Sequence, residues 1–174
     1  VSQYFSPKEV AQAMGVSESS LKRWVDKGLI QASRTAGGHR RLELNSVLAY
    51  VRKSGKGLLN PKAVDLPDGC GSSTSLTVFE ANKPFTEALV TGNEDAACRV
   101  IIDLFVSGAS VASICDHVIA PAFQNVGNMW ECGQVKVYEE RRACEICQRV
   151  VHELRRAVGP GPESGPLAMG GTLD

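Results

Sequence analysis

The 174-residue chain carries no net charge, contains no apolar run of about eighteen residues, and is poor in aromatic residues, which make up 6% of it. Because a membrane-spanning helix needs about twenty mostly apolar residues, the sequence predicts no such helix. It also lacks a glycine-rich phosphate loop after a strand. Glu139 and Glu140 are adjacent on an expected helix, so their carboxylates point in different directions and do not readily share a proton. These absences predict that the protein is not an enzyme.

The six cysteines are too widely spaced for a disulfide-stapled scaffold. Cys144 and Cys147 form a Cys-x-x-Cys pair inside an expected helix, without the strand-turn-helix setting of a redox motif. Together with Cys115 and Cys132 they have the ligand types of a thiolate metal site. Buried free thiols are the interpretation that we favour, and we assign no metal ligand.

The zero net charge hides an asymmetry along the chain. Residues 1–57 hold ten Lys or Arg and four acidic residues, whereas residues 58–174 hold nine and fifteen. A basic segment joined to an acidic one indicates that the first contacts nucleic acid and that the second does not.

The N-terminal segment predicts two short helices. Ser6-Pro7 opens the first, because serine is a good N-cap and proline is accepted at the first helical position. Gly15 then allows a tight turn. Ser17 caps a second helix with a polar and basic outer face, which Gly28 ends. This order is typical of a helix-turn-helix, and an ordinary helical hairpin with a solvated basic face is the alternative.

A glycine-tipped hairpin follows the two helices. Gly37-Gly38 permits a positive φ in a tight turn, and four basic side chains flank it: Arg34, His39, Arg40 and Arg41. Such a hairpin beside a basic helix suits phosphate contacts on both sides of a major groove. Residues 43–52 then predict a third helix.

Several motifs in this segment resemble the MerR-type winged helix-turn-helix. They are Phe5-Ser6-Pro7-Lys8-Glu9-Val10-Ala11, Gly15-Val16-Ser17, Leu21-Lys22-Arg23-Trp24 and Gly37-Gly38-His39-Arg40-Arg41. The resemblance covers residues 1–54. It implies double-stranded operator DNA as partner, a homo-oligomer (dimer or tetramer) and a cytoplasmic location. The residues expected at DNA are Ser17, Ser19, Ser20, Lys22, Arg23, Arg34, Gly38, His39, Arg40 and Arg41, with Ser19, Ser20 and Arg23 nearest the base edges.

The remaining chain predicts a linker and a helical bundle. Residues 55–75 are rich in Gly, Ser and Pro and predict a flexible linker. Residues 76–158 contain four apolar helical patterns with short connections, typical of a four-helix bundle, and Pro121 is expected to kink or interrupt the third. Residues 159–174 predict a second linker and the start of a further α/β domain. The predicted fold class is therefore mainly α: a winged helix-turn-helix (three helices plus a β-hairpin wing) linked to a four-helix bundle.

The bundle also resembles the helical cap of cobalamin-binding modules. The matching residues are Pro121-Ala122-Phe123, Val126-Gly127, Trp130, Gly133, Val135, Val137 and Glu140. By layout the chain resembles the light-responsive, cobalamin-dependent MerR-type repressors, whose pocket positions correspond to Trp130, Val137 and Glu140. Arg141 stands where that family has a histidine, so the resemblance does not extend to this cobalt ligand. His117 and His152 are expected to be ordinary helix histidines.

Several functions remain open at this point. The first, which we favour, is a DNA-binding transcriptional repressor whose bundle senses a signal or oligomerises without cobalamin. The second is a light-sensing repressor whose full-length parent protein binds adenosylcobalamin. The third is a corrinoid-binding methyl-transfer protein, which has no use for the basic N-terminal segment. An excisionase-like architectural protein shares the winged module but usually lacks a sensory bundle.

Overall fold

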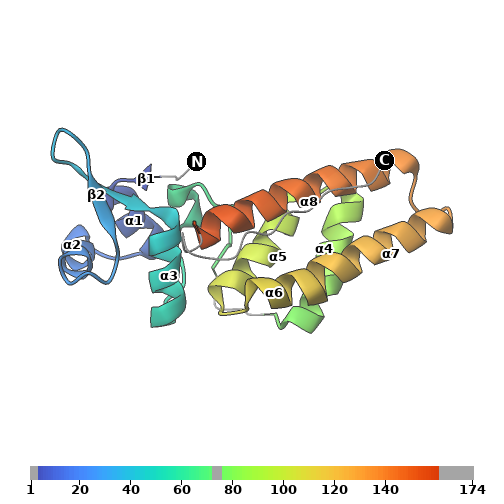
Figure 1. Cartoon of the computed structure of the whole chain (residues 1–174), viewed down its shortest axis with the longest axis horizontal. Helices are drawn as coiled ribbons and strands as arrows, with labels where there is room; N and C mark the ends of the chain where they lie inside the picture. Colours follow the sequence, from blue (N-terminus) through green and yellow to red (C-terminus); the bar gives the residue numbers. More distant parts are fainter. Residues whose placement is uncertain (1–3, 72–75, 161–174) are drawn as a thin grey trace.

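The computed structural model describes residues 4–71 and 76–160, and it has the predicted mainly helical fold (Figure 1). A small winged helix-turn-helix domain lies at one end and a helical bundle at the other. The elements of the first domain are β1 (Tyr4–Phe5), α1 (Pro7–Met14), α2 (Glu18–Asp26), β2 (Ala32–Arg34), β3 (Arg40–Glu43) and α3 (Leu44–Ser54).

The first helix begins where the sequence indicates. The Ser6 hydroxyl accepts a hydrogen bond from the Glu9 amide (3.3 Å), and the Glu9 carboxylate accepts one from the Ser6 amide (2.7 Å). This reciprocal capping box satisfies two amides that no helical carbonyl reaches. Gly15 ends the helix in the left-handed region at φ 64°, which turns the chain toward α2.

Three short antiparallel strands in the order β1, β3, β2 form the wing and its base. Leu42 in the central strand is fully buried and pairs with Phe5 on one side and Ala32 on the other. The predicted hairpin wing is confirmed. The strand β1, which has no local signal in the sequence, fixes the wing to the start of the chain's first helix.

The expected flexible linker is wrong for residues 55–71, because this segment packs into the core. The short helix η1 (Pro61–Val64) lies against α1. The glycine, serine and proline content predicted a mobile segment. The segment is instead held in place, because burying a few of its apolar side chains away from water is favourable. The buried apolar side chains of this segment are Leu58, Pro61, Val64, Leu66 and Cys70.

Hydrogen bonds hold this joining segment at both ends. The amides of Leu59 and Asn60 donate to the Ala13 carbonyl in α1, at 2.8 and 3.0 Å. The Gly71 amide donates to the Asp103 carboxylate in the bundle. One cluster of buried apolar residues therefore continues from the N-terminal domain through residues 58–70 into the bundle.

Four rods of helix form the bundle, as predicted. Its elements are α4 (Val78–Thr91), α5 (Glu94–Val106), α6 (Val111–Ile114), η2 (Cys115–Ile119), α7 (Ala120–Glu131) and α8 (Val137–Val158). The backbone stays helical through α6, η2 and α7, which together make one rod. Phe85, Ile101 and Ile102 are fully buried in the core. The strand expected after residue 159 lies outside the described residues.

Pro121 does not break the third rod. The turn before it, η2, is a π-helix, and Pro121 lies in the first turn of α7. Proline is accepted there, because the amides of a first helical turn have no carbonyl partner within that helix. The side-chain amide of Asn82 in α4 donates to the Val118 carbonyl of this turn at 3.2 Å. The expected disturbance therefore takes the form of a local π-helical turn.

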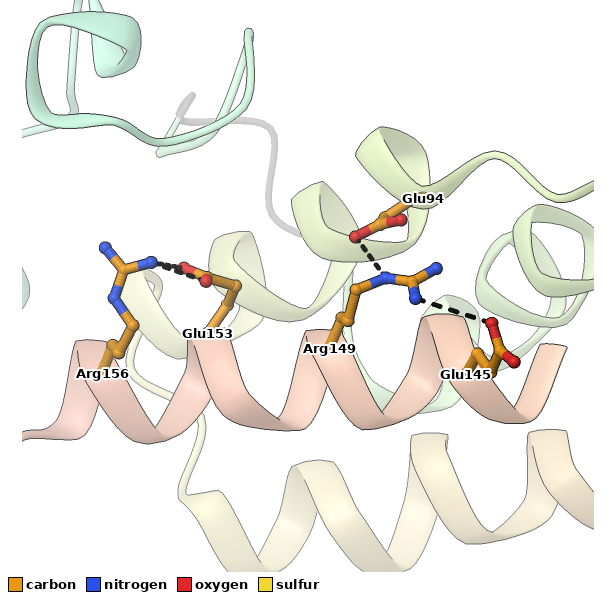
Figure 2. A network of polar contacts seen from close by, with 5 residues as sticks. All are labelled: Glu94, Glu145, Arg149, Glu153 and Arg156. Atoms are coloured by element: carbon orange, nitrogen blue, oxygen red, sulfur yellow. Dashed lines mark hydrogen bonds and ion pairs between the residues drawn. The ribbon is translucent and has the colours of Figure 1, made fainter. Parts of the chain in front are cut away.

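Several ion pairs lie on the surface of α8 (Figure 2). Arg149 reaches Glu94 at the start of α5 (2.9 Å) and Glu145 one turn back in α8 (3.8 Å), while Arg156 pairs with Glu153 (2.6 Å). Of these, the Arg149–Glu94 pair joins two helices. Because exposed pairs contribute only about 0–1 kcal/mol each, the apolar core dominates the packing of α8 on α5.

None of the helices in the described part of the chain combines the length and the apolar character that crossing a bilayer requires.

Replacing Leu58 with alanine tests the packing of the joining segment. Leu58 is 6% exposed and Leu59 is 80% exposed, so the two neighbours form a matched pair. We expect Leu58→Ala to lower the free energy of unfolding by about 2–5 kcal/mol, because it removes buried methyl groups. Leu59→Ala should change it by no more than about 0.5 kcal/mol. Urea denaturation followed by circular dichroism gives both values, and equal small effects would restore the flexible-linker interpretation.

Candidate nucleic-acid interface and cap surface

The second helix presents its polar face to solvent. The Ser17 hydroxyl caps α2 by accepting from the Ser20 amide at 3.2 Å, and the two hydroxyl oxygens lie 3.0 Å apart. Leu21 is fully buried and fixes which face points inward. As a result, three of the predicted DNA-binding side chains are exposed on the outer face: Ser19, Lys22 and Arg23.

An aromatic contact holds α2 against α3. The Trp24 ring packs on the Tyr50 ring with centroids 4.9 Å apart and planes tilted by 35°. Lys56 places its Nζ 4.4 Å from the centroid of the Trp24 ring, within the range of a cation–π contact. The orientation of α2 therefore depends on α3 as well as on the domain core.

The wing ends in a closed turn that needs glycine at one position. The Thr35 amide donates to the His39 carbonyl (2.9 Å), and the Gly38 amide donates to the Thr35 carbonyl (2.8 Å). Gly38 has φ 77°, a conformation that is strained for a residue with a Cβ. Gly37 has no such requirement. The turn leaves the His39 side chain exposed at the tip.

The basic residues of the wing do not share one face. Arg34 lies opposite Arg40 across the two strands, and Ser33 lies opposite Arg41. Because successive side chains of a strand point to opposite faces, Arg41 lies on the face opposite to Arg34 and Arg40. The prediction from the sequence, that all of them contact phosphates, therefore requires contacts from both faces of the wing.

Arg40 has a partner within the domain. Its Nη2 lies 2.7 Å from the Asp26 carboxylate at the end of α2, so the pair ties the wing to that helix. An occupied guanidinium is a poorer phosphate ligand than a free one, and the structure therefore favours a positioning role for Arg40. By contrast, in the part of the chain that the structure describes, no hydrogen bond or ion pair occupies Lys22, Arg23 or Arg34.

The predicted cap residues lie at the end of the bundle where α7 meets α8, away from α2 and the wing (Figure 1). Trp130 near the end of α7 is 47% exposed, and Val137 at the start of α8 is 54% exposed. Tyr138, which the sequence analysis did not select, is 59% exposed beside it. We call these three residues the cap surface. Trp130 is thus not the core anchor that its size alone suggests.

The two remaining cap positions are polar and differ in exposure. Glu140 is half-buried and accepts a hydrogen bond from the Cys144 thiol at 3.2 Å. Arg141 is exposed, and in the described part of the chain it forms no ion pair with Glu140 or Glu145; Glu145 pairs with Arg149 instead.

The next residue, Arg142, is the arginine that turns inward. It donates to the Val90 carbonyl at 2.6 Å. It also fills the space at Gly92, where a Cβ would lie 2.6 Å from the guanidinium carbon. Arg142 therefore pins the start of α8 to the end of α4.

Two histidines of the bundle lie away from the cap surface, and burial keeps two of its thiols protonated. His117 in η2 stacks on Phe79 with centroids 5.2 Å apart, and His152 is exposed farther along α8. Burial raises the pKa of Cys147 to about 11 and that of Cys98 to about 12, so both are neutral thiols at pH 7. Across residues 4–71 and 76–160, no three His, Cys, Asp or Glu side chains are arranged as a metal site.

Two family models match the chain. Residues 4–55 match the model of a helix-turn-helix domain, and residues 82–155 match the model of a B12 binding domain. No curated protein matches it. The first match covers the helices and the wing described above, and the second covers most of the bundle. This combination supports a DNA-binding regulator rather than an enzyme.

The residues present fit a corrinoid only in part. The exposed rings of Trp130 and Tyr138 and the side chain of Val137 offer an apolar surface for a flat macrocycle. Arg141 does not fit a cobalt ligand, because a guanidinium is protonated and carries only hydrogen-bond donors. Cobalt ligation from this position is therefore excluded.

Proposed function

We propose that the protein is a sequence-specific, MerR-type transcriptional repressor that binds operator DNA through α2 and the wing and works without cobalamin. The observation that supports this most is the set of unpaired, exposed cations Lys22, Arg23 and Arg34 on two neighbouring elements. They lie on the domain that carries the basic excess, and electrostatic attraction to phosphates supplies much of the affinity for DNA. The bundle acts as a sensory or oligomerisation module.

The roles of individual side chains follow from their positions. Ser19 and Ser20 lie in the first turn of α2, the part of a recognition helix that meets base edges in the major groove, and Arg23 follows Ser19 one turn later on the same face. Arg34, His39 and Arg41 on the wing contact phosphates. Ser17 and Gly38 maintain the backbone of the helix start and of the wing tip, and Arg40 holds the wing through Asp26.

Assembly on DNA is part of this proposal. A single small module buries only about 600–1,000 Å² on DNA, whereas repressors of this architecture read two half-sites with two modules. We therefore propose that at least a dimer occupies one operator, with the bundle contributing to association.

Salt-dependent binding tests the assigned roles. The probes are an operator selected from a random duplex library and an unrelated duplex of equal length. Arg34→Ala should weaken binding to both and flatten the log–log salt slope by about one unit. Arg23→Ala should instead lower the preference for the operator by about 1–3 kcal/mol, because it removes a base-edge contact.

Two further variants complete this test. Arg40→Ala should weaken binding to both duplexes. It should flatten the log–log salt slope less than Arg34→Ala does, because the charge of Arg40 is paired with Asp26. Arg155→Ala, an exposed cation on the bundle, is the control and should bind as the unchanged protein does. If Arg23→Ala and Arg34→Ala also bind like the control, α2 and the wing are not the DNA interface.

A second candidate function is a cobalamin-dependent, light-sensing repressor, and the B12 binding domain match favours it. Under our proposal, adenosylcobalamin added to the protein in the dark should be separated from it by gel filtration. Illumination should then yield no protein-bound bis-imidazole spectrum, because Arg141 cannot bind cobalt. A co-eluting spectrum that changes on illumination and is lost in Trp130→Ala would establish the second candidate instead.

A further inference from the structure

An arginine of the N-terminal domain covers the end of a bundle helix. The Arg52 guanidinium in the last turn of α3 donates to the main-chain carbonyls of Phe105, Gly108 (3.4 Å) and Ala109 (3.2 Å). Phe105 lies in the last turn of α5, and Gly108 and Ala109 follow the end of that helix, so Arg52 lies at the negative end of the helix dipole. The guanidinium carbon also lies 4.1 Å from the centroid of the Phe105 ring.

This interaction uses features that only arginine provides. Its planar fork presents several donors at once and stacks on an aromatic face, whereas a lysine ammonium is a point charge. Over residues 4–71 and 76–160, no carboxylate lies within ion-pair distance of Arg52. Burial lowers the pKa of Arg52, although arginine remains charged in proteins. The carbonyls of Phe105, Gly108 and Ala109 are therefore the groups that compensate this charge.

The same helix also supports the recognition helix. Tyr50, two residues before Arg52, carries the Trp24 ring of α2. At the other end of α3, Asn45 closes against the end of α8, where a Cβ at Gly159 would lie 2.8 Å from the Asn45 Cβ. A groove of about 480 Å³, lined in part by Arg52, Lys53 and Phe105, borders the contact, so water can replace the carbonyls if it opens.

We propose that Arg52 and the carbonyls of Phe105, Gly108 and Ala109 form a latch that fixes the N-terminal domain on the bundle. A change at the end of α5 is then transmitted through α3 to α2. The effect of the latch on DNA binding rests on the proposed function, but the latch itself does not, and it is tested without DNA.

The experiment compares Arg52→Ala, Arg52→Lys and the matched control Lys53→Ala, which removes the neighbouring exposed cation. Backbone ¹⁵N relaxation of the unchanged protein should give one rotational correlation time for α1–α3 and α4–α8. In Arg52→Ala the shared apolar core should keep this common value, but the order parameters of the α1–α3 amides should fall, because a contact that holds the domain is lost. Arg52→Lys should resemble Arg52→Ala, because it lacks the fork, and Lys53→Ala should retain the order parameters of the unchanged protein.

Two local measurements accompany the relaxation data. Amide exchange at residues 107–109 should be on the order of tenfold faster in Arg52→Ala, as expected for the loss of a charge-assisted hydrogen bond. The indole N–H signal of Trp24 should shift, while that of Trp130, at the far end of the bundle, should not. These readouts also identify a variant that has merely unfolded, since both indole signals would then move.

Unchanged order parameters of α1–α3 in folded Arg52→Ala, with unchanged exchange at residues 107–109, would overturn the latch. Failure of the unchanged protein to bind any duplex would refute the proposed function and leave this result standing. The latch and the proposed function can therefore fail separately.

Discussion

The arrangement of this protein depends on one constraint: its apolar core does not stop at the end of the DNA-binding domain. Leu58, Val64 and Leu66 bury themselves between α1 and the bundle, so the joining segment belongs to the core. Apolar burial stabilises by about 25 cal/mol per Å², enough for a few such side chains to offset the ordering of a short segment. The helix-turn-helix therefore has a defined direction relative to the bundle, and α2 and the wing face away from it (Figure 1).

This direction separates two surfaces of different chemistry. At one end, Arg23 and Arg34 remain without internal partners. At the other, the cap surface exposes the rings of Trp130 and Tyr138 beside Arg141, which cannot serve as a metal ligand. Large exposed aromatic residues indicate a surface that binds a ligand or another protein, whereas unpaired cations indicate attraction to an anionic polymer. The chain thus has the layout of a regulator, with its candidate contact and sensing surfaces at opposite ends.

Much of the fold could be predicted from local sequence signals, because capping and periodicity are local. Ser6 and Ser17 cap helices where expected, Gly38 adopts the positive φ that its wing requires, and the bundle has its four rods. Contacts between distant residues could not be predicted in this way. The glycine and proline content of residues 58–70 predicted a flexible linker and not the packed segment that is observed. No local pattern predicted that Asp26 pairs with Arg40 or that Arg52 binds carbonyls at the end of α5. For that reason we propose a positioning role for Arg40 in addition to the phosphate contact that the sequence predicts.

Mapping the contact surface in solution tests the central claim, that α2 and the wing meet DNA, most directly. A short duplex carrying the selected operator is added to the ¹⁵N-labelled protein, and the shift of each backbone amide is followed. We expect the largest shifts at Ser17–Arg23 and at Arg34–Arg41, with amides of α7 and α8 little changed. Shifts concentrated on the cap surface, or none at saturating duplex, would contradict the account.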